Sequence, residues 1–366
     1  MTDAMPDGAL IGSGRAVTAH AVDVHCHVIV PEMLRGAGGE EPWRPEVSWE
    51  DGRQVVAYRG KRIRSAVREF VRLDRILEQA AAEGVARVVL SPWVNLLPFG
   101  LELEEALEVC RLQNEALSGM ARAEPGRVSA LGAVPLQEPE RAAEELARLM
   151  ALPGVVGVET SASVQGRYLG DDRFEPFWAA AEESGALVFV HPTTRGFGLP
   201  VFDDYYLWNT VANPLETAVT GAHMVMAGVL ERYPRLRVLL AHGGGALLAL
   251  RGRLRHAAGF QPQARARLRG DFDDSLRRFY YDTVTFDEAL LRALIGYVGA
   301  ERVLLGSDRP FDMGSSRPVD EVRALGLPRR QEEAVLSGNA AELLGAAQAG
   351  PDGPRSSGAP TREEGR

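Results

Sequence analysis

Histidine and aspartate residues close several apolar runs of this chain. The run from Val22 ends in His25-Cys-His27, and side chains two positions apart on a strand share one face. His191 ends the run Leu-Val-Phe-Val-His, and Asp308 ends Val-Leu-Leu-Gly-Ser-Asp. Three imidazoles and one carboxylate are ligands typical of zinc and similar divalent ions. We therefore predict one divalent metal ion, Zn²⁺ by preference, bound by His25, His27, His191 and Asp308.

A further histidine, His242, ends the apolar run Val-Leu-Leu-Ala-His. The predicted metal already has four ligands without it, so we predict that His242 acts beside the metal as general acid or base, together with Asp308. Three glycines follow His242 and let the backbone approach a ligand closely at a helix N-terminus. A phosphate cradle is the alternative for these glycines, but no lysine follows at the P-loop spacing.

Each of these residues also has a purely structural interpretation. A single histidine at a strand end is usually a hydrogen-bonded structural residue, and Asp308 alone could cap a helix. Coincidence at four strand ends favours function, because the remaining histidines, His20, His223 and His256, fall in a tail or in helical stretches. Cys26 lies between the two histidines and should point to the opposite face, where we predict packing rather than metal binding.

Short β-branched runs alternate with longer segments whose apolar residues repeat at helical spacing. The alternation predicts an α/β fold, a (β/α)₈ TIM-like barrel, with an open doubly wound sheet as the alternative. The predicted strands are Val22 to His27, Ala86 to Ser91, Val128 to Val134, Val155 to Thr160, Leu187 to His191, Arg237 to His242, Arg278 to Val284 and Arg302 to Asp308. The predicted helices include Val67 to Glu83, Leu103 to Ala121, Glu138 to Met150, Phe174 to Glu183, Pro214 to Arg232 and Ala289 to Val298.

Two long irregular stretches follow predicted strands one and five, Pro31 to Ser65 and Pro192 to Asn213. In a barrel such loops roof the active site. Tyr205, Tyr206 and Trp208 in the second stretch are candidates for an aromatic lid over a substrate, or for ordinary loop packing.

The composition of the chain indicates where its folded part ends, which partners it has and where it is located. Residues 1–20 and 345–366 are rich in small, polar and charged residues and are predicted to be disordered tails around a barrel of residues 21–344. The formal charge of -9 and the absence of a long basic run disfavour nucleic acid and membrane partners and favour a small molecule. With two distant cysteines and no apolar export or membrane segment, we expect a cytoplasmic protein.

Several of these elements together resemble one branch of the amidohydrolase superfamily. The His-X-His, His-Pro, Ala-His-Gly-Gly-Gly and Gly-Ser-Asp-X-Pro-Phe elements are similar to those of the amidohydrolase-related decarboxylases, and in particular the 2-amino-3-carboxymuconate 6-semialdehyde decarboxylase group. The likeness is densest from Asn213 to Arg253 and weaker from Val22 to about Leu344.

The resemblance implies a metal-dependent, nonoxidative carboxy-lyase that acts on a small unsaturated or aromatic carboxylic acid without an organic cofactor. It also implies a homodimer in which Arg253 reaches across the interface to a substrate carboxylate, although a solvated helix charge is the alternative for this residue. The family's arginine after strand one aligns near Val56, and Arg59 or Arg53 lies close enough to take its place.

Other departures from the family pattern concern Arg309 and Glu159. Arg309 stands where the family has an aromatic residue, and it either supplies a cation to the substrate or caps a loop. In the wider superfamily a second metal calls for a lysine or carboxylate at the end of strand four. Only Glu159 is present there, and we predict a supporting or structural role for it. The alternative activity is hydrolysis or hydration of a lactone, amide or unsaturated acid by the same site, and a noncatalytic binding protein is a third possibility.

Overall fold

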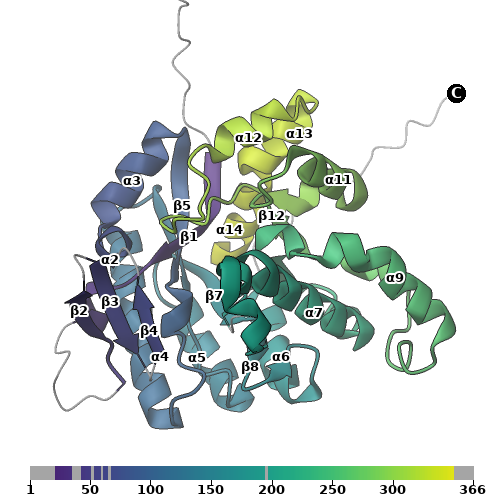
Figure 1. Ribbon diagram of the computed structural model, residues 1–366, viewed down its shortest axis with the longest axis horizontal. Coiled ribbons are helices and arrows are strands. Elements are labelled where there is room, and N and C mark those ends of the chain that lie inside the picture. The colour runs from purple at the N-terminus through teal and green to yellow at the C-terminus, as the bar shows by residue number, and fades with distance from the viewer. Residues whose placement is uncertain are drawn as a thin grey trace, which may run out of the picture.

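A sheet of eight parallel strands forms the centre of the molecule. The computed structural model describes residues 21–34, 43–50, 53–58, 61–64, 67–193 and 197–349. The strand order in the sheet follows the chain, and helices surround the strands as a (β/α)₈ barrel requires (Figure 1). The eight predicted strands are thereby confirmed. They are β1 (Ala21–Val28), β5 (Val85–Pro92), β6 (Val128–Gly132), β7 (Val155–Ser161), β10 (Leu187–His191), β11 (Arg237–Leu240), β12 (Tyr280–Asp282) and β13 (Val303–Leu304).

Hydrogen bonds between β1 and the segment that follows β13 join the first and last strands. The backbone N–H of Val24 donates to the carbonyl of Leu305 over 2.9 Å, and that of Asp308 donates to His25 over 2.8 Å. Further along, the N–H of His27 donates to Arg309 over 2.8 Å. The carboxyl ends of β1 and β13 therefore lie side by side, which places the two predicted metal-ligand segments next to each other.

The helices largely follow the apolar periodicity of the sequence. Two predicted helices are each divided in two, Val67 to Glu83 near Val71 and Pro214 to Arg232 at Gly228. Gly228 has a φ of +69°, a conformation that favours glycine and ends a helix. The principal helices are α2 (Val67–Phe70), α3 (Leu73–Ala82), α4 (Leu103–Ala123), α5 (Pro139–Met150), α6 (Glu175–Ser184), α7 (Asn213–Met226), α8 (Val229–Arg232), α9 (Leu247–Phe260), α10 (Phe272–Leu276), α11 (Glu288–Val298), α12 (Pro318–Ala324), α13 (Arg329–Glu333) and α14 (Asn339–Ala349).

Apolar side chains fill the barrel below the strand ends that carry the histidines. Val24, Val156 and Phe189 are among the buried residues of a cluster that α14 completes with Leu343 and Leu344. Close packing of this kind holds the strand ends rigidly. The barrel interior is thus a packed core, and polar side chains are left to gather at its mouth.

The segment after β1 contains regular structure that the sequence did not lead us to expect. Helix α1 (Pro31–Leu34) is followed by a three-stranded antiparallel sheet of β2 (Glu46–Glu50), β3 (Arg53–Tyr58) and β4 (Lys61–Arg64). The segment after β10 consists of short helical turns, including Trp208–Ala212, that lead directly into α7. Both segments lie on the side of the barrel that carries the histidines.

Other features bear on the predicted boundaries and location. Helix α14 continues to Ala349, past the boundary predicted at residue 344, and residues 1–20 and 350–366 lie outside the described residues. Cys26 and Cys110 are both buried free thiols, and Cys26 packs into the main apolar cluster as predicted. Within the described parts of the chain, no helix is both long enough and apolar enough to cross a bilayer.

Candidate active site

Three histidine rings at the barrel mouth each turn Nδ1 toward an oxygen acceptor. Nδ1 of His25 lies 2.6 Å from Oδ2 of Asp282, and Nδ1 of His27 lies 3.2 Å from the carbonyl of Pro92. Nδ1 of His191 lies 2.9 Å from the carbonyl of the proline that follows it. A ring nitrogen facing an oxygen acceptor carries the proton, which leaves Nε2 as the unprotonated, metal-binding nitrogen. All three rings therefore present Nε2 as a potential ligand.

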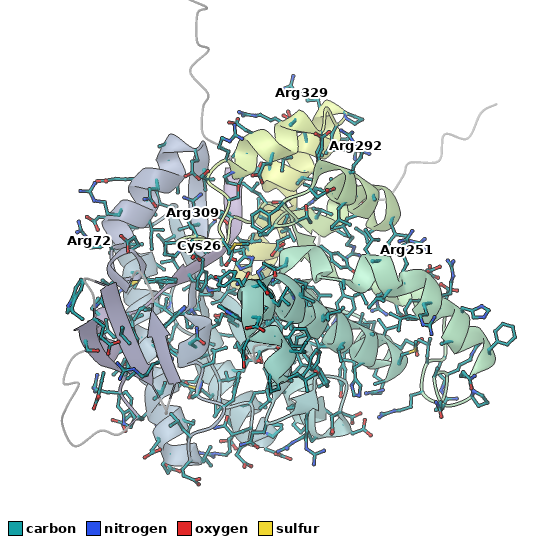
Figure 2. The ribbon with its side chains drawn as sticks, in the orientation of Figure 1. Cys26, Arg72, Arg251, Arg292, Arg309 and Arg329 are labelled. Atoms are coloured by element: carbon teal, nitrogen blue, oxygen red, sulfur yellow. The ribbon has the colours of Figure 1, made fainter. Side chains whose placement is uncertain are left out.

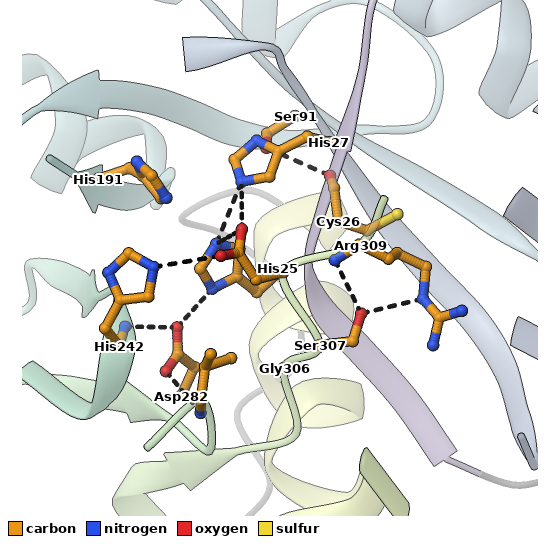
Figure 3. Close-up of polar contacts among 12 residues, drawn as sticks. His25, Cys26, His27, Ser91, His191, His242, Asp282, Gly306, Ser307 and Arg309 are labelled. Carbon is orange, nitrogen blue, oxygen red and sulfur yellow. Dashed lines mark hydrogen bonds and ion pairs between the residues drawn. The ribbon is translucent and has the colours of Figure 1, made fainter. Parts of the chain in front are cut away.

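These nitrogens converge on the carboxylate of Asp308. Nε2 of His25 and Nε2 of His27 are 3.1 Å apart, and Oδ1 of Asp308 lies 3.1 Å from the first and 3.3 Å from the second. The His191 ring centre is 5.2 Å from that of His25 and 4.9 Å from that of His27 (Figure 3). The structure thus brings together the four residues predicted as metal ligands.

The arrangement fits a divalent cation. Nε2 of His191 is buried and has no hydrogen-bond partner among the described residues, and Oδ1 of Asp308 faces the ring nitrogens of His25 and His27. Imidazole nitrogens together with one carboxylate suit zinc and similar ions. The ligand atoms of His25, His191, His242 and Asp308 all lie within 4.8 Å of one another, so these residues could also hold the ion, with His242 in place of His27.

Two observations distinguish His242 from the other histidines. Its side chain is 16% exposed and borders the pocket described below, whereas His25 and His27 are fully buried. Its Nε2 lies 3.4 Å from Oδ2 of Asp308, while its Nδ1 has no partner in the described chain. His242 is therefore placed to contact both Asp308, on which the other ligands converge, and a molecule bound in the pocket.

Asp282 at the end of β12 supports the cluster from below, and sequence reasoning did not single it out. Besides contacting His25, its carboxylate accepts the backbone N–H of His242 over 2.9 Å and that of Gly243 over 2.8 Å. Burial alone would raise the pKa of Asp282, but His25 and the backbone donors hold this pKa below its usual value. The predicted strand ran on to Val284, whereas β12 ends at Asp282. With the observed strand end, the positional rule that selected Asp308 and His191 would have selected Asp282 too.

The electrostatics of the cluster reflect two carboxylates around buried imidazoles. Burial lowers the pKa of His25, but Asp308 and Asp282 outweigh burial and raise it to about 10. Burial and the neighbouring histidines lower the pKa of His191 well below its usual value. Burial would raise the pKa of Asp308, yet His25 and the other histidines hold it well below the usual value. The carboxylates thus favour a positive charge at the centre of the cluster.

A pocket of about 560 Å³ opens above the cluster. His191, His242 and Asp308 border it from the barrel, while residues of the antiparallel sheet and of the segment after β10 form its sides. The size suits a small molecule, and the mixture of aromatic and polar walls is typical of ligand sites. The residues of its wall include Arg62, Phe70, Trp93, Tyr206, Trp208 and Asn213.

The predicted substrate-binding residues are placed differently from one another. Trp208 borders the pocket and packs edge-on against Tyr206, with ring centres 4.9 Å apart, whereas Tyr205 is 91% exposed. Arg253 is exposed on α9 and does not border the pocket of its own chain. Arg59 lies outside the described residues. Arg62 on β4 does border the pocket, where it contacts Glu50.

Arg309 faces away from the pocket into a buried ion-pair network. Its Nε lies 3.1 Å from Oδ2 of Asp23 and its terminal nitrogen lies 2.5 Å from Glu83, and the side chain is 5% exposed. Figure 3 shows Arg309 beside Ser307, whose hydroxyl lies 2.9 Å from its Nε. The expectation that Arg309 could supply a cation to the substrate is therefore wrong. The reason is that Asp23, a residue of β1, is itself fully buried and needs a cationic partner.

Glu159 on β7 lies beneath the cluster. Its Oε1 is 3.8 Å from Nδ1 of His27, and burial raises the pKa of its carboxyl well above the usual value. The position is consistent with the supporting role that we predicted.

The comparisons with known proteins agree with this geometry. A family model described as amidohydrolase matches residues 22–346. The chain is 29% identical to a 2-amino-3-carboxymuconate-6-semialdehyde decarboxylase of Dictyostelium discoideum, an alignment that covers 74% of this chain and 76% of the relative. It is 28% identical to a gamma-resorcylate decarboxylase of Rhodococcus jostii, covering 78% of this chain and 87% of the relative.

Solved structures share the fold. The apo form of the Metarhizium anisopliae enzyme called IDCase superposes with a TM-score of 0.78 at 24% identity, covering 89% of this chain and 97% of that one. A dihydroxybenzoic acid decarboxylase from Polaromonas, solved with manganese and the inhibitor 2-nitroresorcinol, gives a TM-score of 0.73 at 21% identity, covering 89% and 97%. These likenesses establish the (β/α)₈ fold.

Proposed function

Because this chain belongs to the amidohydrolase family, we propose that it is a metal-dependent, nonoxidative decarboxylase of a small aromatic or unsaturated carboxylic acid. The relatives that bear decarboxylase names support this proposal. The observation that carries it is the position of His242, which stands at the pocket wall beside Asp308 while His25 and His27 turn Nε2 toward the same carboxylate.

We assign the metal to His25, His27, His191 and Asp308. His27 is fully buried, does not border the pocket and has its Nδ1 tied to Pro92, all of which suit a ligand. Three nitrogens and one oxygen favour Zn²⁺, although a related decarboxylase was solved with manganese. When bound, a divalent cation supplies Lewis-acid polarisation of the substrate oxygens.

His242 then handles the proton of the reaction. Its protonated imidazole gives a proton to the carbon that bears the carboxylate, and that carbon becomes tetrahedral. The bond to the carboxylate then breaks, its electron pair restores the double bond, and carbon dioxide leaves. His242 regains its proton from solvent. Asp308, 3.4 Å from Nε2 of His242, orients the ring.

The substrate carboxylate needs a cationic partner, and we propose that a homodimer supplies it. Among the described residues that border the pocket, Arg62 is the arginine, and it already contacts Glu50. Arg253 is exposed on α9 and available to a neighbouring subunit, as the family resemblance implies. Arg59 and Trp208 are further candidate contacts. Two buried free thiols agree with a reducing, cytoplasmic location.

The test is a direct assay of product. Metal-loaded protein is incubated with a panel of hydroxybenzoates and carboxymuconate analogues, and release of carbon dioxide is measured beside a His242→Asn control. We expect release from at least one acid, and none from the control. Turnover of lactones or amides without release of carbon dioxide from any acid would replace this proposal with a hydrolase or hydratase.

A further inference from the structure

Two polar atoms in the pocket wall have no hydrogen-bond partner among the described residues and lie outside the histidine cluster. They are Nε1 of Trp93 and Oδ1 of Asn213. Both side chains are more than nine-tenths buried, with 1% and 8% exposure. An indole N–H can only donate, and an amide oxygen can only accept. Buried polar groups almost always have partners, so the pair points to a ligand that supplies both an acceptor and a donor.

The indole of Trp93 differs from that of the other deeply buried tryptophan, Trp178. Trp178 donates its Nε1–H to the carbonyl of Leu169 over 3.1 Å. Trp93 is fixed just as firmly, since its backbone N–H donates to Val28 over 2.9 Å and its ring packs 5.7 Å from that of Phe70. Trp93 therefore borders the pocket with a buried indole N–H that has no partner among the described residues.

Asn213 is held at the pocket by the start of α7. The carbonyl of Pro214, the next residue, accepts the backbone N–H of Ala246 over 3.1 Å. A Cβ at Gly245 would lie 2.1 Å from this same carbonyl oxygen, so the glycine turn packs directly on the helix start. The amide of Asn213 is thereby fixed beside the turn that begins with His242.

The two side chains flank the cluster from different sides. Pro92, the neighbour of Trp93, accepts a hydrogen bond from His27. Asn213 adjoins the turn after His242, and both Trp93 and Asn213 border the pocket that includes His191 and Asp308. A small molecule in this pocket therefore has both Trp93 and Asn213 in its wall.

We propose that Trp93 and Asn213 determine which acid the pocket accepts. Trp93 donates a hydrogen bond to an oxygen of the bound acid, and Asn213 accepts one from a hydroxyl or amino substituent on the same molecule. The inference rests on the proposed function, because it takes the pocket as the site of a small acid. Both residues act in specificity, and neither transfers a proton.

Three planar probes separate the two contacts. 2-Nitroresorcinol offers nitro oxygens and hydroxyl groups, resorcinol lacks the nitro acceptor, and nitrobenzene lacks the hydroxyl donors. Titration calorimetry gives the Kd of each probe for metal-loaded wild type, Trp93→Phe and Asn213→Leu. Trp178→Phe is the matched control, since it removes an indole N–H that does not border the pocket.

Trp93→Phe should weaken the binding of 2-nitroresorcinol and of nitrobenzene about tenfold, the scale of one hydrogen bond, and leave the Kd of resorcinol unchanged. Asn213→Leu should weaken the binding of 2-nitroresorcinol and of resorcinol and leave the Kd of nitrobenzene unchanged. The control should bind all three probes as wild type does. Equal weakening of every probe by Trp93→Phe, no weakening at all, or failure of wild type to bind 2-nitroresorcinol would overturn the inference.

A second readout uses the wild-type protein, in case Trp93→Phe disturbs the fold. The chain has five tryptophans, and resonance assignment of ¹³C,¹⁵N-labelled wild-type protein identifies the indole N–H signal of Trp93. This signal should shift when 2-nitroresorcinol is added and stay in place with resorcinol, and the absence of a shift with 2-nitroresorcinol contradicts the inference. Neither measurement needs turnover. If the probes bind as expected but no acid releases carbon dioxide, the proposed reaction is wrong and the role of Trp93 and Asn213 in binding stands.

Discussion

Nδ1 of His25 lies 2.6 Å from Oδ2 of Asp282, and this pair joins two parts of the site. The carboxylate that fixes the His25 ring also accepts the backbone N–H groups of His242 and Gly243. Asp282 therefore orients a proposed metal ligand and holds the turn that carries the proposed proton donor. Partners of this kind fix the orientation and basicity of a ligating histidine.

We expect Asp282→Asn to weaken metal binding by about 10- to 100-fold, the usual cost of losing a carboxylate behind a ligating histidine. The amide keeps the shape of the side chain but removes the charge that favours the bound cation. Chelator competition followed by elemental analysis measures the affinity. Asp74→Asn, on the exposed surface of α3, is the control and should retain wild-type affinity. Wild-type affinity in Asp282→Asn would contradict this role.

Substitution of His242 and of His27 should have different effects. His242→Asn should retain the metal and lose activity by about 10²- to 10⁴-fold, the range for a general acid. His27→Asn should lose the metal as well as activity. Elemental analysis and product assays on both variants distinguish the assignments. If His242→Asn loses the metal and His27→Asn keeps it, His242 is the ligand and the proton must come from elsewhere.

Loss of Arg309 should destabilise the barrel where its first and last strands meet. Arg309→Met leaves the buried carboxylate of Asp23 without its cation, and removing one partner of a buried pair costs about 3–5 kcal/mol. The free energy of unfolding is measured by denaturant titration. Arg329→Met is the control, because the side chain of Arg329 is 91% exposed at the rim and its pair with Glu333 should contribute less than about 1 kcal/mol (Figure 2). Equal effects of the two substitutions would contradict the account of Arg309.

Mixed dimers test whether Arg253 completes a neighbouring site. We expect Arg253→Ala and His242→Asn each to be inactive, because one removes the carboxylate contact and the other the proton donor. After the two proteins are unfolded and refolded together, a mixed dimer contains one site with both residues, and activity should reappear. A mixture as inactive as its components, with dimers present by light scattering, would place Arg253 outside the site.

Removal of the metal should lower the melting temperature. A ligand that binds only the folded state stabilises that state. Removal of the metal would leave the buried carboxylates and imidazoles of the cluster without their common cation. Differential scanning calorimetry before and after chelation, and after Zn²⁺ or Mn²⁺ is restored, measures the change. An unchanged melting temperature after chelation would indicate that the cluster does not hold an ion in the purified protein.

The barrel and its polar mouth could be predicted because the strands are buried on both faces and end in polar residues. His25, His27, His191, His242 and Asp308 all follow this rule. Asp282 was missed because the predicted strand ran on to Val284, which placed Asp282 inside the strand, whereas β12 ends at Asp282. Cys26 was also placed correctly, because alternation along a strand decides which face a side chain takes.

Other features depend on contacts that one sequence does not display. The sheet of β2, β3 and β4 lies in a stretch whose Asp51-Gly52 dipeptide is a hairpin signal. The stretch is mostly polar, however, and its apolar residues alternate with polar ones too weakly to predict strands. The pairing of Arg309 with Asp23 joins residues almost a whole chain apart, and so does not follow from local pattern. Whether a buried indole such as Trp93 has a hydrogen-bond partner is likewise decided only by the packed structure.

The most direct test of the central claim is anomalous diffraction at the metal absorption edge from crystals of the loaded protein. We expect one peak about 2.0–2.2 Å from Nε2 of His25, His27 and His191 and from a carboxylate oxygen of Asp308, with His242 outside bonding distance. No peak among these side chains, or a peak bonded to His242 and not to His27, would contradict the account.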